Sequence, residues 1–314
     1  MDSPFGNFCR LIAGKHGRTK VISPEVVAQE WIAHSGLSAL PSLSEIGRQM
    51  ERYGLAVHAA SIPDLRGHHF RYSSGRHTVL YEADEWRGAA EFTLLHEFYE
   101  IVMERLQELG NPARSPGRAR MCWMANRFAA AVLMQKDIFL QALRESHFDI
   151  VWLHHHFYRS YAAVAIRALE LLDEMDETAR RELACVIYDR DVEGGSDDVG
   201  LAVLRVSFSR CTAVLRRSLT ASPRLLPRRG ECVAPGSVVE LALAESRPVL
   251  VTRASWDRRG GERPLCLLAR PVRWFGEPAK VVLVGMRAGD GHILEAQARP
   301  LRAIVLDALE GWRL

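Results

Sequence analysis

A helix around the residues FTLLHEFYE, at positions 92–100, is the sequence feature that most constrains the fold of this chain. Over positions 86–109, apolar residues recur at the spacing of one helical face. His96 lies among these apolar residues, so Glu97 and Glu100 face a half-buried setting in which carboxylates need hydrogen bonds or a cation. The segment therefore predicts a long helix that holds polar groups next to a core.

The motif H-E-x-x-E at 96–100 differs from the zinc-protease signature H-E-x-x-H in its last residue. His96 and Glu100 are one helical turn apart and can reach one metal ion, and zinc accepts a carboxylate oxygen in place of an imidazole. Glu97 occupies the position of the residue that activates water in such proteases. Alone the motif is weak evidence for a metal site. Glutamates at this spacing usually form a solvated helix face, and His96 can be a histidine of the core.

Residues 1–145 are expected to form the first of two α+β domains. Helix caps, turn residues and the period of the apolar positions define its elements. In chain order we expect helices at 23–36 and 42–54, strands at 55–62, 68–73 and 77–82, and helices at 86–109 and 118–142.

Residues 146–188 are expected to form a helical segment that resembles a helix-turn-helix. Within it, residues 149–172 have the apolar rhythm of two short helices hinged at positions 158–160. The second helix, YAAVAIRAL, is nearly free of polar groups that read bases, so packing within the protein is favoured over DNA contact. The acidic, glycine-rich residues 189–200 are interpreted as a linker.

Residues 201–314 are expected to form a compact second α+β domain. Its short apolar segments predict strands at 200–210, 237–245, 247–255, 264–272 and 280–287, and a terminal helix at 298–312. This domain holds 19 Lys and Arg against 10 Asp and Glu, whereas residues 1–200 hold 22 against 28. The basic surplus could attract nucleic acid or another polyanion, and a solvated arginine-rich surface explains it equally well.

Composition disfavours several classes of protein. The longest apolar run, 128–134, is far shorter than the roughly 20 residues of a membrane span, and MDSPFGNFCR lacks the pattern of a secretion signal. The six cysteines have no paired spacing, so neither a disulfide framework nor a zinc ribbon is indicated. The HHH run at 154–156 is not expected to bind metal, because adjacent helical residues point in different directions. We therefore expect a cytoplasmic protein with no membrane contact.

Two motifs, in this order, resemble the ImmA/IrrE family of metallo-endopeptidases. GRHTVLYEADEWRGAAEFTLLHEFYEIV is followed by CWMANRFAAAVLMQ, in which ANRFAAAVLM at 125–134 is close to the second motif of the family. The resemblance covers roughly residues 20–175 and implies a zincin-like metallopeptidase domain. Residues 201–314 resemble, more faintly, the GAF-like sensor domain that is attached to some members.

The resemblance assigns roles to residues of the site. His96 stands at the first-ligand position, Glu97 at the general-base position, and Glu100 at the second-ligand position, where the family usually has histidine. The third ligand of the family is a glutamate four residues before the motif asparagine, and before Asn126 that position holds Cys122. Because both substitutes are competent ligands, we interpret the site as a rebuilt Zn²⁺ site. A lost metal and a merely structural Cys122 are the alternatives.

The function implied by the resemblance is that of a regulatory zinc metallo-endopeptidase. Such an enzyme cleaves a helix-turn-helix repressor in response to stress, gated here by the sensor domain. A thiolate from Cys122 would lower the positive charge at zinc, so we expect a weak or latent peptidase with a removable inhibitory ligand. Single-stranded DNA or another polyanion is the expected activator at the basic C-terminal domain. The alternative is a catalytically inactive metallopeptidase-like regulator that binds protein or DNA.

Overall fold

The computed structural model describes residues 3–16, 22–62, 65–73, 75–110, 117–175, 181–190, 204–218, 226–255, 264–274 and 277–306. It divides into two compact units. The first comprises Met1–Phe139 with Phe157–Ser160, and the second Leu140–His156 with Tyr161–Leu314. Within the described ranges, no helix combines the length and hydropathy needed to cross a membrane.

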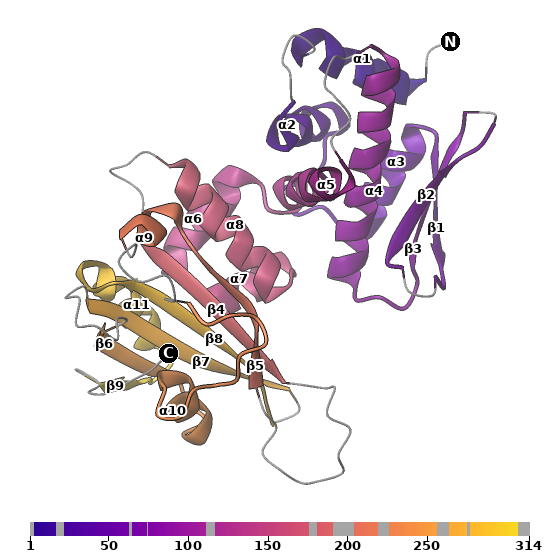
Figure 1. Cartoon of the computed structure of the whole chain (residues 1–314). Helices are drawn as coiled ribbons and strands as arrows, with labels where there is room; N and C mark the ends of the chain where they lie inside the picture. Colours follow the sequence, from indigo (N-terminus) through magenta and orange to yellow (C-terminus); the bar gives the residue numbers. More distant parts are fainter. Residues whose placement is uncertain are drawn as a thin grey trace. The chain divides into compact units, whose positions relative to one another are not determined.

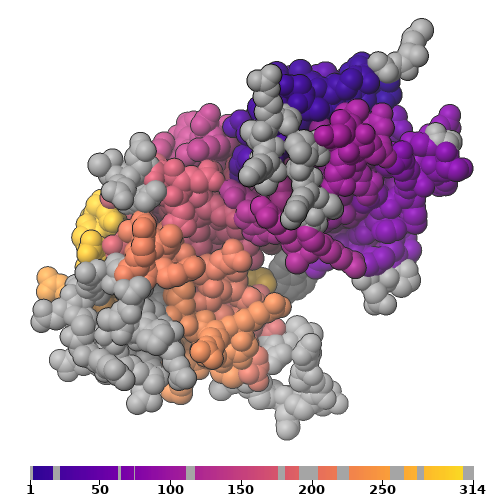
Figure 2. Space-filling model, turned by 45° about the horizontal axis from the view of Figure 1, so that its top comes forward, coloured from indigo at the N-terminus to yellow at the C-terminus, as the bar shows by residue number. Residues whose placement is uncertain are grey.

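The first unit combines a small sheet with helices. Its elements are α1 (Pro4–His16), α2 (Pro24–Ser35), α3 (Leu43–Arg52), β1 (Leu55–Ala60), β2 (Gly67–Arg71), β3 (His77–Glu82), α4 (Arg87–Glu108) and α5 (Arg118–Leu133). The strand order is β1-β3-β2, with β1 parallel and β2 antiparallel to β3, so β2 is an edge strand. Helix α4 lies against β2 and β3 (Figure 1). The N-terminal helices, indigo in Figure 2, form part of the outer surface of this unit.

The apolar face of α4 forms the centre of the core of this unit. Leu95, Phe98 and Val102, which recur at helical spacing, are fully buried. The ring of Phe98 lies 4.6 Å from that of Trp31 in α2 and 6.0 Å from that of Phe128 in α5. The core thereby fixes the rotation of α4 about its axis, and with it the direction of its polar face.

Local signals set the ends of the first helices as expected. The side chain of Ser42 accepts a hydrogen bond from the N–H of Glu45 and caps α3. Gly36 ends α2 with a φ of 67°, in the left-handed region that favours glycine. The single helix expected at 118–142 is instead two, α5 and α6 (Lys136–Glu145), because Met134 departs from helical geometry with φ −133° and ψ 70°.

Helices α7 (Ile150–Phe157) and α8 (Tyr161–Glu174) confirm the expected helix pair, and the turn between them is anchored in the first unit. Nη1 of Arg159 lies 2.6 Å from Oε2 of Glu91 in α4, and both side chains are buried. Oε1 of the same carboxylate accepts the backbone N–H of Leu43 at 2.8 Å. A Cβ on Gly88 would lie 2.5 Å from the carbonyl oxygen of Tyr158, so this close approach requires glycine. Glu91 therefore joins α3, α4 and the turn.

The second unit is built on a six-stranded sheet in the order β5-β4-β8-β7-β6-β9. Its elements after α8 are β4 (Leu183–Arg190), β5 (Leu204–Cys211), α9 (Ala213–Ser218), α10 (Val238–Ala244), β6 (Val249–Ser255), β7 (Pro264–Trp274), β8 (Glu277–Arg287), η1 (Ala288–Asp290), α11 (Gly291–Ala298) and β9 (Ile304–Leu306). Neighbouring strands are antiparallel except β6 and β9. Helices pack on this sheet, and the arrangement fits the expected GAF-like fold (Figure 1).

The start of this sheet lies earlier in the chain than expected. Residues 183–190 form β4, although 146–188 was expected to be helical and 189–200 a linker. Positions 183–188 are all buried, so the strand lacks the apolar–polar alternation that identifies a half-buried strand in a sequence. Linker residues 191–200 lie outside the described residues.

Two further elements of this unit differ from the expectation. Residues 237–245 form α10 and not a strand, because Ser237 accepts a hydrogen bond from the N–H of Glu240 and caps a helix. In place of the helix expected over 298–312, residues 304–306 form β9, which pairs with β6. Residues 307–312 lie outside the described residues.

Replacing Glu91 by Gln is expected to destabilise the first unit by about 3–5 kcal/mol, because it removes the negative charge that faces the buried guanidinium of Arg159 at 2.6 Å. Urea denaturation followed by tryptophan fluorescence measures this, since Trp31 lies in the same unit. Lys15→Ala is the control, because it breaks an ion pair with Glu30 in which the lysine is half-exposed, worth about 0–1 kcal/mol. Equal midpoints for the two variants would contradict the role of Glu91.

Candidate metal centre

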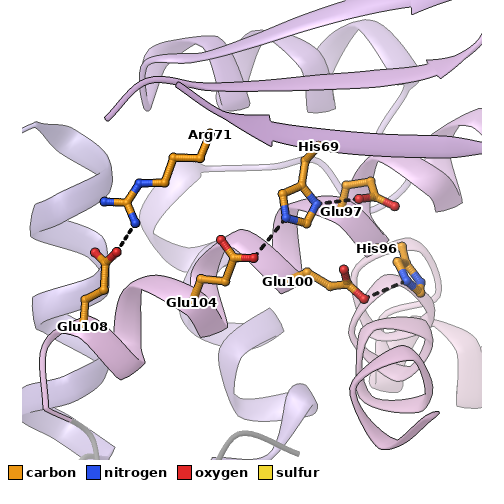
Figure 3. A network of polar contacts seen from close by, with 7 residues as sticks. All are labelled: His69, Arg71, His96, Glu97, Glu100, Glu104 and Glu108. Carbon is orange, nitrogen blue, oxygen red and sulfur yellow. Dashed lines mark hydrogen bonds and ion pairs between the residues drawn. The ribbon is translucent and has the colours of Figure 1, made fainter. Parts of the chain in front are cut away.

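The polar face of α4 carries a row of carboxylates directed toward β2. Glu97, Glu100, Glu104 and Glu108 are spaced by three or four residues, which places them along one side of the helix. Figure 3 shows them beneath the strand, each in contact with a basic side chain. Because the opposite face of α4 is held in the core, this row has a fixed direction.

His96 is held on both sides of its ring. Nδ1 donates a hydrogen bond to Oδ1 of Asn126 in α5 at 2.8 Å, and Nε2 lies 3.3 Å from Oε1 of Glu100. Burial lowers the pKa of His96, but the hydrogen bonds to Glu100 and Asn126 outweigh it and raise the pKa. The same contact with His96 lowers the pKa of Glu100. In a metal-binding histidine, one ring nitrogen is usually held by a hydrogen bond while the other faces the metal. His96 has this arrangement, with Nδ1 held by Asn126.

Glu97 is buried and interacts with His69 from β2. Its Oε2 lies 2.6 Å from Nδ1 of His69, whose Nε2 lies 3.2 Å from Oε1 of Glu104 (Figure 3). Burial opposes the charge on this ring, but the hydrogen bonds to Glu104 and Glu97 raise the pKa of His69 to about 10. His69 therefore lies between two carboxylates of α4 as an imidazolium.

The close approach of β2 to α4 depends on a glycine and on strand alternation. A Cβ at Gly67 would overlap the methyl group of Thr93 in α4, so a side chain there would push the strand away. Because side chains alternate along a strand, His69 and Arg71 lie on the same face of β2 as Gly67. Both contact α4, where His69 pairs with Glu97 and Arg71 pairs with Glu108. His68, between Gly67 and His69, is exposed and packs against Phe70 with ring centroids 4.6 Å apart.

The expected ligand set is only partly assembled. His96 and Glu100 lie together, and Glu97 is next to them, but Cys122 is exposed and forms no group with them. Helix α5 reaches the imidazole of His96 through Asn126 at Nδ1, whereas Nε2 faces Glu100. Cys122, one turn before Asn126, does not belong to a group of described residues whose potential ligand atoms lie within 4.8 Å of one another.

A different residue joins the carboxylates. Among the described residues, the group of three whose potential ligand atoms all lie within 4.8 Å of one another is His69, Glu97 and Glu100. A divalent ion fits this donor set, because imidazole nitrogen and carboxylate oxygen are common metal ligands. From the sequence, His68 and His69 could line the cleft, but a solvent-facing strand was favoured, so His69 was not counted among the ligands. The signal available was the alternation of β2, which places positions 67, 69 and 71 on one face.

Comparisons with known proteins agree with the fold. Residues 50–169 match the family model of the IrrE N-terminal-like domain, Peptidase_M78. A solved structure of a Mycobacterium tuberculosis transcriptional regulator is similar over 92% of this chain and 83% of that chain, with a TM-score of 0.56 and 17% sequence identity, which shows a shared fold. A GAF domain/HD domain protein from Geobacter sulfurreducens, 11% identical over 55% of this chain and 95% of its own, has a TM-score of 0.22 and carries no argument. No curated protein matches the chain.

This chain thus carries an IrrE N-terminal-like domain of the peptidase M78 type, and its resemblance to the ImmA/IrrE family is confirmed. The matched residues include the whole of α4 and α5, and so all the site residues named above. The class defined by fold and site is that of a metallopeptidase-like protein.

The raised pKa of His69 predicts how the stability of the metal-free protein varies with pH. Its ordinary pKa is 6.5 and its folded pKa is about 10, so its ion pairs stabilise the fold fully below about pH 6.5, and this contribution is lost as the pH rises through about 10. Urea midpoints measured with a chelator are expected to fall more steeply over this range for the wild type than for His69→Gln.

His68→Gln is the matched control, because it changes the neighbouring imidazole, which is exposed, and leaves the pairs with α4 intact. Its profile is expected to follow the wild type. Parallel profiles for the wild type and His69→Gln would contradict the ion pairing of His69.

Proposed function

We propose that this chain is a regulatory zinc metallo-endopeptidase that cleaves a helix-turn-helix transcriptional repressor in response to stress. The observation that carries the proposal is the H-E-x-x-E helix of an IrrE N-terminal-like domain, with Nε2 of His96 3.3 Å from Oε1 of Glu100. The fold shared with a mycobacterial transcriptional regulator supports a regulatory role.

The chemistry assigns separate roles to the residues of α4. Zinc bound at this face would supply a Lewis acid that polarises the peptide carbonyl. His96 and Glu100 would hold it, and Asn126 would keep the ring of His96 in place through the hydrogen bond to Nδ1. Glu97 would accept the proton of the attacking water on its carboxylate and pass it to the leaving amine. Its burial against β2 limits the orientations of that carboxylate.

Strand β2 is the proposed seat of the substrate. It is an edge of the described three-stranded sheet, so an extended peptide could pair with its outer backbone groups. This edge lies beside the proposed base, because His69 of the same strand contacts Glu97. A repressor segment in extended form would therefore present its backbone next to α4.

Control of the peptidase is assigned to the C-terminal GAF-like domain, in the cytoplasm. The support is its charge, 19 Lys and Arg against 10 Asp and Glu in residues 201–314, which favours a polyanion such as single-stranded DNA as the activator. A small ligand bound by the GAF-like fold is the other candidate signal.

A second candidate function is that of a catalytically inactive regulator that binds protein or DNA. Two observations favour it. Cys122 does not join His96 and Glu100, and the carboxylate of Glu97 is engaged by His69, which reduces its readiness to accept a proton. This candidate keeps the fold of the peptidase and uses its surfaces only for binding.

Glu97→Gln tests the peptidase directly. The purified chain, loaded with zinc, is incubated with the helix-turn-helix protein encoded nearest to its gene, with and without single-stranded DNA, and cleavage is followed by mass spectrometry. The wild type is expected to cleave, and Glu97→Gln to be slower by about 10²–10⁴-fold, the usual contribution of a general base. Glu108→Gln on the same helix, whose partners are Arg71 and Arg105, is the control and is expected to cleave normally.

Equal rates for Glu97→Gln and the wild type would contradict the role of Glu97. If the wild type cleaves nothing but binds the repressor or DNA, the inactive regulator is the correct reading.

A further inference from the structure

The group formed by His69, Glu97 and Glu100 joins two elements, the edge strand β2 and helix α4 (Figure 3). We propose that a divalent metal ion is held between β2 and α4 by these three residues, so that His69 and Glu97 stand where the sequence pattern places His96 and Cys122, and Glu100 is common to both sets. This inference rests on the proposed function, because both require a metal at the polar face of α4. It assigns the ligand outside α4 to strand β2 and not to helix α5.

The two ring nitrogens of His69 have different roles in this site. Nδ1 lies 2.6 Å from the carboxylate of Glu97, so it is the ring nitrogen that faces this ligand. Nε2 lies 3.2 Å from Oε1 of Glu104, which is not a member of the group. A metal-binding histidine usually donates its other N–H to a carboxylate, which fixes the tautomer and the ring orientation. Glu104 is that partner, because its carboxylate already contacts Nε2 of His69.

Electrostatics favour an ion at this place. Glu97, Glu100 and Glu104 bring three carboxylates to one stretch of α4. Glu97 and Glu104 already lie against the two ring nitrogens of His69, at 2.6 Å and 3.2 Å. A divalent ion beside Nδ1 would be attracted by each of these carboxylates. Two carboxylates and a neutral imidazole would give a formally neutral centre.

The donor set indicates the class of metal. One nitrogen and two carboxylate groups form an oxygen-rich site, which suits Mn²⁺ as well as Zn²⁺. A sulfur ligand would have favoured zinc, but Cys122 does not contribute one to this group. Manganese and zinc are therefore the two ions to test.

Metal binding at this position has a consequence for catalysis. Glu97 is a ligand here, so its carboxylate is no longer free to accept a proton from water. Glu100 belongs to this group and also lies 3.3 Å from Nε2 of His96, so the two positions share one carboxylate. A chain with its metal against β2 is a latent peptidase, and a shift of the metal toward His96 would free Glu97.

The experiment measures metal binding and not activity. Full-length protein is stripped with a chelator and titrated with Mn²⁺ and, separately, Zn²⁺ by isothermal titration calorimetry, and the metal content after dialysis is determined by mass spectrometry. The variants are His69→Ala, His69→Gln, Glu104→Gln and Cys122→Ala. His68→Ala is the matched control, since its side chain is exposed and makes no contact with α4 carboxylates among the described residues.

Both His69 variants are expected to bind at least about 100-fold more weakly than the wild type, and Glu104→Gln about 10- to 100-fold more weakly. His68→Ala and Cys122→Ala are expected to bind as the wild type does. His69→Gln keeps a polar side chain at the strand, and the unfolding midpoint of each stripped variant shows whether the fold is intact.

Two results would overturn the inference. If the His69 variants bind normally while Cys122→Ala, or His96→Ala made as a fifth variant, loses the metal, the ion lies beside His96 and away from β2, and the proposed peptidase stands without this site. If the wild type binds neither ion, both the inference and the metallopeptidase fail, and the inactive regulator remains.

Discussion

The double role of helix α4 is the constraint on which the first unit depends. One face of this helix is fully buried at Leu95, Phe98 and Val102, while the adjacent face carries carboxylates at 97, 100, 104 and 108. Packing of Phe98 on the aromatic rings of α2 and α5 prevents rotation of the helix. The carboxylates therefore pair with His69 and Arg71 of β2 and, within α4, with His96 and Arg105. The site exists because apolar burial and charge pairing share one element.

The features that were predictable from the sequence are those governed by local chemistry. The caps at Ser42 and Gly36 and the long helix of the H-E-x-x-E motif follow from spacing along one segment. The place of Asn126 at the site was implied by the family resemblance. The register of β2 against α4 was not predictable, because it depends on the strand order β1-β3-β2 and on the absence of a side chain at Gly67. His69 was missed for this reason.

The other failures have equally specific causes. Strand β4 is buried on both faces and so shows no alternation, and α10 was read as a strand although Ser237 and Glu240 form a helix cap. Cys122 was placed by its distance from Asn126 along the chain. That spacing says nothing about which side of the His96 ring α5 approaches, and in the structure it approaches Nδ1. The recognised fold therefore identified the right helices but not the full set of contacts between them.

The position of a bound metal tests this account most directly. Anomalous diffraction from crystals of the full chain grown with Mn²⁺ or Zn²⁺ locates the ion without reference to activity. The account predicts a single anomalous peak between β2 and α4, about 2.0–2.2 Å from Nδ1 of His69 and from oxygens of Glu97 and Glu100. A peak bonded to the sulfur of Cys122, or one bonded to His96 and remote from β2, would contradict a metal held between β2 and α4.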